Sequence, residues 1–538
     1  MKRFLLTLSA LCALGTLSFA QNRINAEVEV SNDYRTRLAD VEKYSVGMAV
    51  PDSLYKFNLD FDYAVFENPY KGAYEFSPYA IKLTPDKSVY DGHKLYVRAG
   101  AGWTMRPRVS AVWTPVATAT DRLNVYQDLG GYFGTYYPNY DALDMYEKIG
   151  VNGQHNGAKA TIGYGLGYDG MFVDGSQNNF YHTGNAHFSI KSTVNDKSYF
   201  YYDLNASYLF ALDRYRDNVM ENSLRIYGTL GPVIKRNFRI FVDLDAAGIM
   251  YSNNWKGAMV NVKATPRIAA KLGPVDVSAG IKLDYNLLGS SSEFKFFPDA
   301  RLSLKIAKAL EFYAVCTGDV ETYDYDRLKR INRHIRYDIT TYGQMVTFGT
   351  TDLDAYGGIK GGVFDHLQYD ISGGWRKVSG VPMLDDGGYF FGTNYKTIHV
   401  DAKLSWKNDF LEAELDGHFN KVSDMVSSYL IYTKLLTFPI TVSNVYALPQ
   451  LTGEARVTYN WNRRLYVGVS ALASTARTAS NLSELPAYVN LGAYAEWKFA
   501  GRWSVWMSGD NLLGQNIYYV PLYSQKGPSV TAGVCFVL

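Results

Sequence analysis

The sharpest candidate site in this sequence is a set of histidines and aspartates on two adjacent predicted strands: His399, Asp401, Asp416 and His418. Residues two apart share one face of a β-strand. A two-residue turn at residues 408–409 would place His399 opposite His418 and Asp401 opposite Asp416, about 5 Å apart at Cβ. Two imidazoles beside two carboxylates could hold a divalent metal.

The same side chains also fit a polar ladder. In that interpretation the like charges are relieved by Lys403 and by neighbouring strands, and no metal is needed. We expect no cofactor for this chain, and the metal site stands as a separate hypothesis.

A second candidate site is a run of basic side chains in a long predicted loop: Arg327, Lys329, Arg330, Arg333 and Arg336. Guanidinium and ammonium groups bind phosphate and carboxylate oxygens. The cluster could therefore bind an anionic ligand or the phosphates of lipopolysaccharide. The alternative is a solvated loop, or a short helix folded into the interior of the protein.

Motifs for catalysis are absent from the sequence. It contains no Gly-x-Ser-x-Gly, no His-Glu-x-x-His and no phosphate-binding glycine-rich loop. The net charge of +2 is too small to indicate that the chain binds nucleic acid. Cys316 and Cys535 are too few and too far apart for a disulfide framework, so we expect two inert thiols on strands. We predict that the chain is not an enzyme.

The candidate residues lie in segments that alternate apolar and polar side chains, and this pattern recurs along the chain. From Phe200 to Phe210 the even positions are apolar, and from Val489 to Phe499 the odd positions are largely so. The segments run about 9 to 14 residues, the length that a tilted membrane strand needs. Many end in an aromatic residue, as Trp406 and Trp461 do, which is typical of a girdle at the lipid–water boundary. A soluble β-sandwich would have shorter strands.

Short and long connections between these segments also favour a membrane barrel. Tight turns are predicted at 272–274, 407–410, 461–464 and 499–502. Long loops are predicted at about 136–156, 323–350, 378–395 and 424–446. Such alternation matches short periplasmic turns and long extracellular loops. The fold class is therefore all-β: a transmembrane antiparallel β-barrel of 22 strands, within a range of 20–24, and the stretch 95–130 is ambiguous because prolines interrupt it.

The N-terminus has the layout of a secretory signal peptide. Lys2 and Arg3 precede an apolar stretch that ends in Ser18-Phe19-Ala20, so we place cleavage after Ala20. The alternative is an uncleaved membrane anchor. The predicted domains are a signal peptide at 1–20, an N-terminal segment at 21–90 and the barrel at 91–538. The segment 21–90 would be either a periplasmic strap or the first strands.

The end of the chain resembles the final hairpin of TonB-dependent receptors. Residues 503–513 read WSVWMSGDNLL, Tyr518-Tyr519-Val520-Pro521 follow, and residues 527–538 read GPSVTAGVCFVL. In that family a strand ends in an Asn-Leu element, a tyrosine-rich loop follows, and a last strand closes the barrel. The resemblance implies a signal for the barrel-assembly machinery at alternating positions of that strand: Val534, Phe536 and Leu538. The family favours a terminal aromatic residue, and here the chain ends in leucine.

The resemblance covers the barrel and not the N-terminal plug of those receptors, so this chain looks like the plugless barrels common in Bacteroidota. It implies an outer-membrane location, where outer-membrane lipid and lipopolysaccharide surround the barrel. Because the plug is not matched, the resemblance does not imply that this chain imports solutes by a TonB-driven mechanism.

Two functional hypotheses follow. The first is solute uptake or transport across the outer membrane, with selectivity set by luminal charges and by the long loops. The alternative is a non-conducting accessory barrel that docks partners in an envelope complex, such as a surface lipoprotein or a periplasmic protein. A barrel of this width must be filled by loops, by segment 21–90 or by a partner.

Overall fold

The computed structural model describes residues 94–103, 106–118, 120–134, 142–173, 179–193, 200–214, 219–232, 238–252, 257–307, 309–335, 346–363, 366–432, 437–442, 445–479, 483–525 and 527–538, with four two-residue strands before them. Those four are β1 (Phe61–Asp62), β2 (Phe66–Glu67), β3 (Tyr74–Glu75) and β4 (Ala80–Ile81). The predicted signal peptide lies outside the described residues, and so does most of segment 21–90.

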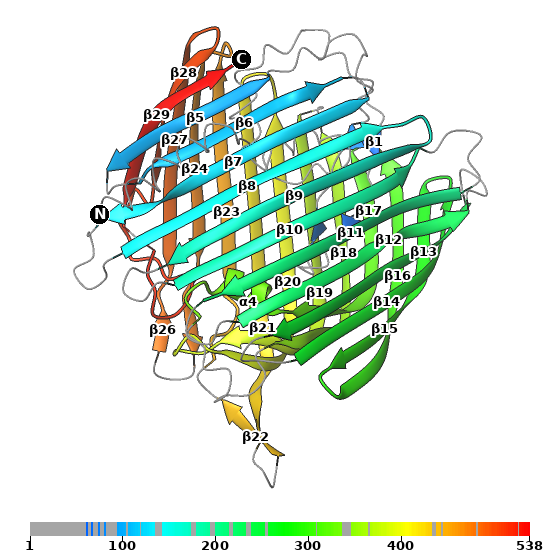
Figure 1. Cartoon of the computed structure of the whole chain (residues 1–538). Coiled ribbons are helices and arrows are strands. Elements are labelled where there is room, and N and C mark those ends of the chain that lie inside the picture. The colour runs from blue at the N-terminus through cyan, green and yellow to red at the C-terminus, as the bar shows by residue number, and fades with distance from the viewer. Residues whose placement is uncertain are drawn as a thin grey trace.

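The chain forms one closed barrel of 22 antiparallel strands, as the sequence predicted (Figure 1). Its first strands are β5 (Leu95–Trp103), β6 (Arg108–Ala117), β7 (Asp121–Gly134), β8 (Ala142–Asn156), β9 (Ala160–Val173), β10 (Asn179–Ser192), β11 (Phe200–Asp213), β12 (Val219–Pro232), β13 (Phe238–Ser252), β14 (Gly257–Leu272) and β15 (Val275–Leu288). The others are β16 (Ser291–Ala307), β17 (Leu310–Tyr323), β18 (Thr347–Val363), β19 (Leu367–Leu384), β20 (Phe390–Lys407), β21 (Leu411–Tyr432), β23 (Leu451–Trp461), β24 (Leu465–Ser474), β27 (Tyr488–Ala500), β28 (Trp503–Asp510) and β29 (Ser529–Val537).

The ring closes where the last strand pairs with the first barrel strand. In β29, Val534 lies opposite Ala99 of β5. The strand β22 (Thr437–Val442) pairs with the far end of β21, while β21 also pairs directly with β23. The hairpin of β21 and β22 therefore projects from one end of the barrel, as Figure 1 shows, and does not add a strand to the wall.

A few small elements complete the described chain. β25 (Arg477–Ala479) and β26 (Ser483–Leu485) form a hairpin between β24 and β27, and α4 (Tyr325–Ile331) lies between β17 and β18. Within the described residues, no helix is long and apolar enough to cross a membrane.

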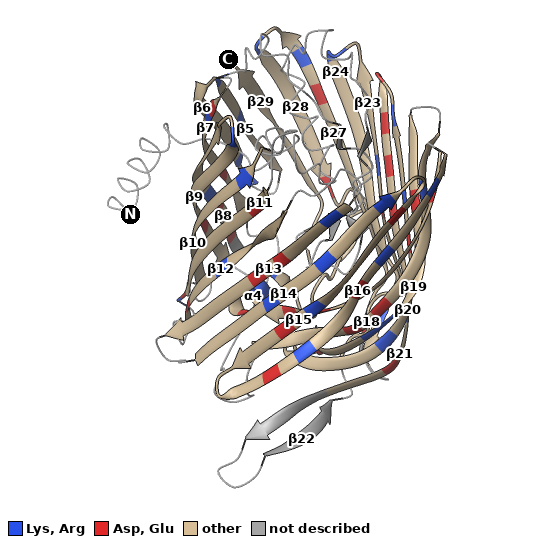
Figure 2. Cartoon of the chain, turned by 90° about the vertical axis from the view of Figure 1, so that its right-hand side faces the viewer, with Lys and Arg blue, Asp and Glu red and all other residues tan. Residues whose placement is uncertain are grey.

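Alternating side chains give the wall its two faces. Outward apolar residues such as Leu166, at 64% exposure, and Phe296, at 74%, would face lipid. Charged residues of both signs lie along the strands (Figure 2). In the last strand Val534 and Leu538 are exposed, and Phe536 packs on Trp503 with ring centroids 4.7 Å apart. Their role in assembly stays a prediction.

Three expected long loops proved to be largely strands, and one of them, 424–446, contains the end of β21 and all of β22. Most of 136–156 belongs to β8, and 378–395 is a hairpin of β19 and β20 joined by residues 385–389. Tyrosine, aspartate and glycine suggested loops, but Asp144, Tyr146 and Gly150 lie on the inner face of β8, and in 378–395 only Asp385 to Tyr389 form a connection. The ambiguous stretch 95–130 contains β5, β6 and β7, and Pro115 falls at a register shift between Trp113 and Val116.

The longest connections between strands of the wall gather at one end of the barrel, which also carries short ones such as residues 289–290. Residues 324–346, 433–450, 475–487 and 511–528 join strands at the first end, while 273–274, 408–410, 462–464 and 501–502 join them at the second. This asymmetry is that of extracellular loops and periplasmic turns.

Candidate functional site

The candidate site is a loop that folds back inside the barrel, and we call residues 324–335 the inner loop. It contains α4, whose N-cap is Asp324: the carboxylate accepts from the Arg327 amide at 2.9 Å. Asp326 lies in the first turn, and Lys329 and Arg330 lie in the last. These charges complement the helix dipole, so seven residues can hold a helix.

Apolar side chains seat the inner loop between two parts of the wall. Leu328 is fully buried, and Tyr325 and Ile335 are nearly so. They pack with inward residues of β10 to β14 and of the segments around β17, β18 and β20: Tyr181, Ala211, Val219, Ile249, Tyr251, Met259, Tyr323, Val346 and Phe390. The loop-bearing half of the lumen therefore contains a hydrophobic core.

Buried polar contacts fix this core to β11 and β12. Lys329 and Asp213 are 2.7 Å apart, with side chains 0% and 1% exposed. The Tyr325 hydroxyl donates to Asp213 at 2.7 Å, and its backbone amide donates to Glu221 at 2.9 Å. Isolated buried charges are costly, so each of these groups depends on its partner.

Further contacts carry the inner loop across to β8 and β9. Arg330 bonds Asp169 at 3.2 Å, and Arg333 bonds Asp144 at 2.5 Å. On other sides, Asn332 donates to the Gly388 carbonyl in the β19–β20 connection. The His334 ring stacks on Tyr523 of the β28–β29 connection, with centroids 3.8 Å apart. The inner loop thus leaves β17 and is tied to the opposite side of the lumen.

Burial also perturbs the carboxyl group at the start of the inner loop. It raises the pKa of Asp324 to about 6, and the nearby charge of Asp326 adds to this effect. The Arg327 amide and the charges of Arg327 and Arg330 act in the opposite sense. The protonated form of Asp324 is therefore accessible under mildly acidic conditions.

The basic cluster singled out in the sequence belongs to this inner loop. Arg327 pairs with Glu321 at 2.6 Å, and Lys329, Arg330 and Arg333 have the partners given above. Arg336 lies outside the described residues. The expected alternative, a short helix folded inside, describes this segment. Anion binding stays a prediction, and an anion would have to compete with these carboxylates.

The histidine–aspartate set lies on one inner face, but its register differs from the expectation. Asp401 is opposite His418, and His399 is opposite Asn420. The Asn408 side chain accepts from the amides of residues 410 and 411, at 3.1 and 2.7 Å. This Asx turn moves the tip to residues 409–410, so each pair shifts by two residues and keeps its face.

These side chains form a chain of charged contacts. Asp401 lies 3.0 Å from His399 Nδ1 and 2.6 Å from His418 Nδ1. The other ring nitrogens face Asp354 at 3.0 Å and Asp416 at 3.2 Å. Every imidazole nitrogen here faces a carboxylate, an arrangement that suits two N–H donors per ring. In the described residues no group of three or more potential ligands has a metal-binding arrangement, and the metal site stays a hypothesis.

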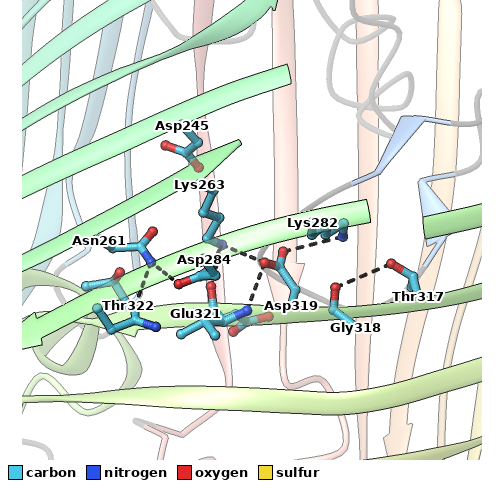
Figure 3. A network of polar contacts seen from close by, with 12 residues as sticks. Asp245, Asn261, Lys263, Lys282, Asp284, Thr317, Gly318, Asp319, Glu321 and Thr322 are labelled. Atoms are coloured by element: carbon cyan, nitrogen blue, oxygen red, sulfur yellow. Dashed lines mark hydrogen bonds and ion pairs between the residues drawn. The ribbon is translucent and has the colours of Figure 1, made fainter. Parts of the chain in front are cut away.

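A third inner network escaped the sequence reasoning. Lys263 of β14 bonds Asp319 of β17 at 2.6 Å, and Lys282 of β15 lies 3.9 Å from the same carboxylate (Figure 3). Asn261 donates to Asp284 at 2.9 Å. The opposition of Lys263 and Asp284 follows from adjacent strands. The contact with Asp319 does not, because it spans three strands and follows a register shift in β17.

Comparisons with solved structures show the same barrel fold. The FrpB iron transporter from Neisseria meningitidis (F3-3 variant) matches with a TM-score of 0.63 and 10% identity, over 84% of this chain and 82% of that one. The siderophore receptor PirA from Acinetobacter baumannii matches with a TM-score of 0.59 and 10% identity, over 82% and 80%. The copper transporter OprC has a TM-score of 0.59 and 11% identity, over 83% and 81%.

No protein-family model matches the sequence, and no curated protein matches it. Identities of 10–11% show a shared fold and not a shared substrate. The chain is therefore similar in barrel architecture to an iron transporter, a copper transporter and a siderophore receptor.

Proposed function

We propose that this chain is an outer-membrane uptake barrel of the TonB-dependent-receptor-like, plugless kind, in which the inner loop closes the lumen until a solute arrives. The observation that carries this proposal is the ion-paired inner loop, tied from β17 to the opposite wall. It occupies the interior, where a receptor of this width otherwise needs a plug.

The contacts of the inner loop suit a gate better than a fixed filler. Arg330 and Arg333 are 45% and 41% exposed, so water reaches these pairs and weakens them. The Lys329–Asp213 pair is dry and would act as the anchor. A solute that binds the open arrangement better than the closed one would shift the loop outward.

A reversible cross-link tests whether uptake requires the inner loop to move. Cysteines would replace Arg333 and Asp144, joined by a cleavable bifunctional reagent in a Cys316→Ser background. Ferric siderophores and copper are the first solutes to try, since structural neighbours are transporters and receptors for such cargo. Uptake into proteoliposomes or cells should stop on cross-linking and return on cleavage.

That experiment needs two controls. The uncross-linked variant must take up solute as the native protein does, which shows that the two cysteines are tolerated. A cysteine pair at Lys271 and Asp276, an exposed pair on the β14–β15 turn 3.6 Å apart, should leave uptake unchanged. Unaltered uptake through the cross-linked 333–144 variant would contradict a moving inner loop. No uptake of any solute by the native protein would favour the accessory-barrel alternative.

A further inference from the structure

Four carboxylates of the inner wall lie beneath the inner loop, and they come from four of the strands β8 to β12. We call them the wall carboxylates: Asp144 of β8, Asp169 of β9, Asp213 of β11 and Glu221 of β12. The first three pair with Arg333, Arg330 and Lys329, in that order. The backbone amides of residues 325 and 326 donate to the fourth, at 2.9 and 3.3 Å. All four belong to the wall, so they stay in place when the inner loop leaves.

Glu221 shows that the inner loop does not use all of the negative charge at this place. Its side chain is fully buried, yet its Oε1 atom has no hydrogen-bond partner in the part of the chain that the structure describes. The backbone amides given above reach only its Oε2 atom. A buried acceptor without a donor is costly, so the site can take further donors, such as those of a guanidinium or ammonium group.

The contact of Arg333 shows which cation the wall carboxylates suit best. Its two terminal nitrogens donate to the two oxygens of Asp144, Nη1 to Oδ1 at 3.1 Å and Nη2 to Oδ2 at 2.5 Å. This fork matches a guanidinium group to a carboxylate, and an ammonium group cannot reproduce it. Arg330 adds a second guanidinium contact, to Asp169 at 3.2 Å. The carboxylates of β8 and β9 therefore favour guanidinium groups.

The burial of the two partners decides which of them an incoming solute would replace. Arg330 and Arg333 are 45% and 41% exposed, whereas their carboxylates are 19% and 14% exposed. An anion that bound the arginines would leave the wall carboxylates as unpaired negative charges in a largely buried place, which is costly. A cation that bound the wall would keep those charges paired and release the arginines into water. The second exchange costs less free energy.

The solute would need more than one positive charge. Arg330 and Arg333 lie on one short segment, so their contacts support each other, and linked contacts bind more tightly than either alone. Lys148 of β8 also offsets part of the negative charge, because its Nζ atom lies 3.7 Å from Asp169. A solute with a single charge would displace one arginine and leave the other bound. Two or more cationic groups on one molecule are required to displace both.

We propose that the wall carboxylates select the solute, and that this solute carries two or more cationic groups, with guanidinium preferred over ammonium. Asp144 and Asp169 are the specificity-determining residues, and the inner loop occupies their site as an internal substitute for the solute. Acidic side chains that line a pore select cations in the same way. The inference rests on the proposed function, because it assigns the cargo of the same gate.

Three tripeptides with the same backbone test this charge preference on the full chain: triarginine, trilysine and triglutamate. The measurement is the labelling rate of Ile335→Cys with Cys316 replaced by serine, since Ile335 is 2% exposed in the closed arrangement. Triarginine should raise the rate at a concentration about tenfold lower than trilysine requires. Triglutamate should leave the rate unchanged. Sodium chloride at equal ionic strength controls for screening of the ion pairs.

Block of an open barrel measures recognition by the wall without any movement of the inner loop. A glycine–serine linker replaces residues 324–335, and heat-modifiable gel mobility checks that the barrel is folded. Triarginine should then block the single-channel current. Asp144→Asn together with Asp169→Asn should raise the half-blocking concentration about tenfold. The matched control is Asp276→Asn, which removes a 51% exposed carboxylate on the β14–β15 turn and should leave the block unchanged.

Three results would overturn the proposal. They are opening of the inner loop by triarginine that triglutamate or salt reproduces, an open barrel that triarginine does not block, and a block that is unchanged by Asp144→Asn with Asp169→Asn. Failure of the proposed uptake function gives a different result. The native protein would then take up no solute and residue 335 would stay unlabelled with every peptide, while triarginine would still block the open barrel through Asp144 and Asp169. That result supports cation recognition by the wall and contradicts a moving gate.

Discussion

At the scale of single residues, the Lys329–Asp213 pair decides how firmly the inner loop is seated. Both side chains are fully buried, so Lys329→Met leaves an uncompensated carboxylate and should weaken the closed arrangement by about 3–5 kcal/mol. A cysteine placed at Ile335, which is 2% exposed in the closed arrangement, can be labelled only when the loop opens, so its labelling rate reports how often it opens. That rate should rise in the Lys329→Met protein.

The double variant separates charge from packing. Lys329→Met with Asp213→Leu removes both charges and should recover most of the loss, because apolar pairs often replace buried ion pairs without cost. A matched control is Lys271→Met, which breaks an exposed pair with Asp276 and should cost less than about 1 kcal/mol. If the single and double variants label equally fast, the pair does not anchor the loop.

Acidification should tighten the inner loop through Asp324. Its pKa is raised by burial to about 6 from an ordinary value of 3.8, so the charged form is the one the closed loop disfavours. The closed arrangement is thus weakened as pH rises through this window, and it regains stability as pH falls from 7.5 to 5. The labelling rate of the cysteine at residue 335 should drop accordingly.

Asp324→Asn isolates this effect, because asparagine also caps a helix and stays neutral at every pH. The variant should lose the part of the pH dependence that Asp324 causes and should match the native protein at low pH. An unchanged pH profile in Asp324→Asn would assign the dependence to other groups.

The sequence predicted the face of single residues but not their contact partners. The sequence correctly placed His399, Asp401, Asp416 and His418 on one inner face. The face of a side chain depends only on the alternation within its own strand, which can be read from the local sequence. The sequence mispaired these residues, since the side chain of Asn408 decides where the turn falls. It found the basic cluster but not Asp213, which lies over a hundred residues earlier on another strand.

At the scale of elements, the seam between β29 and β5 depends on glycine. A Cβ at Gly533 would lie 2.0 Å from the carbonyl oxygen of Ala99, so the two strands could not come this close. Gly533→Ala should lower the fraction of chains that fold to the closed barrel. The measurement is the heat-modifiable gel mobility of the barrel after refolding.

Gly248→Ala on β13 is the matched control, since nothing lies within 4 Å of the added atom. It should fold as the native chain does. Equal folding of the two variants would show that the seam tolerates a side chain.

Elements were largely predictable because their signal is periodic. The alternation identified most strands, and the short turns at 272–274 and 499–502 fall between strands as expected. The stretch 136–156 was mistaken for a loop because an inward face of Asp144, Tyr146, Lys148 and Gly150 has the composition of one. In a barrel with a wet lumen, polar composition does not separate strand from loop.

At the scale of the whole molecule, the sequence predicted a 22-strand barrel and the need to fill it, but not what fills it. In our proposal the inner loop closes the lumen, and it is held there by contacts between segments far apart in the chain, such as Arg333 with Asp144. No local pattern encodes such pairs. The only sign of these ion pairs that we found in the sequence was the cluster of basic residues at 327–333.

The central claim is that the inner loop closes the lumen, and single-channel conductance in a planar bilayer tests it most directly. The native barrel should be nearly silent. A barrel in which a glycine–serine linker replaces residues 324–335 should show large, steady openings, provided that its gel mobility shows a folded barrel. A large open conductance of the native protein, or a silent barrel after the replacement, would contradict the account.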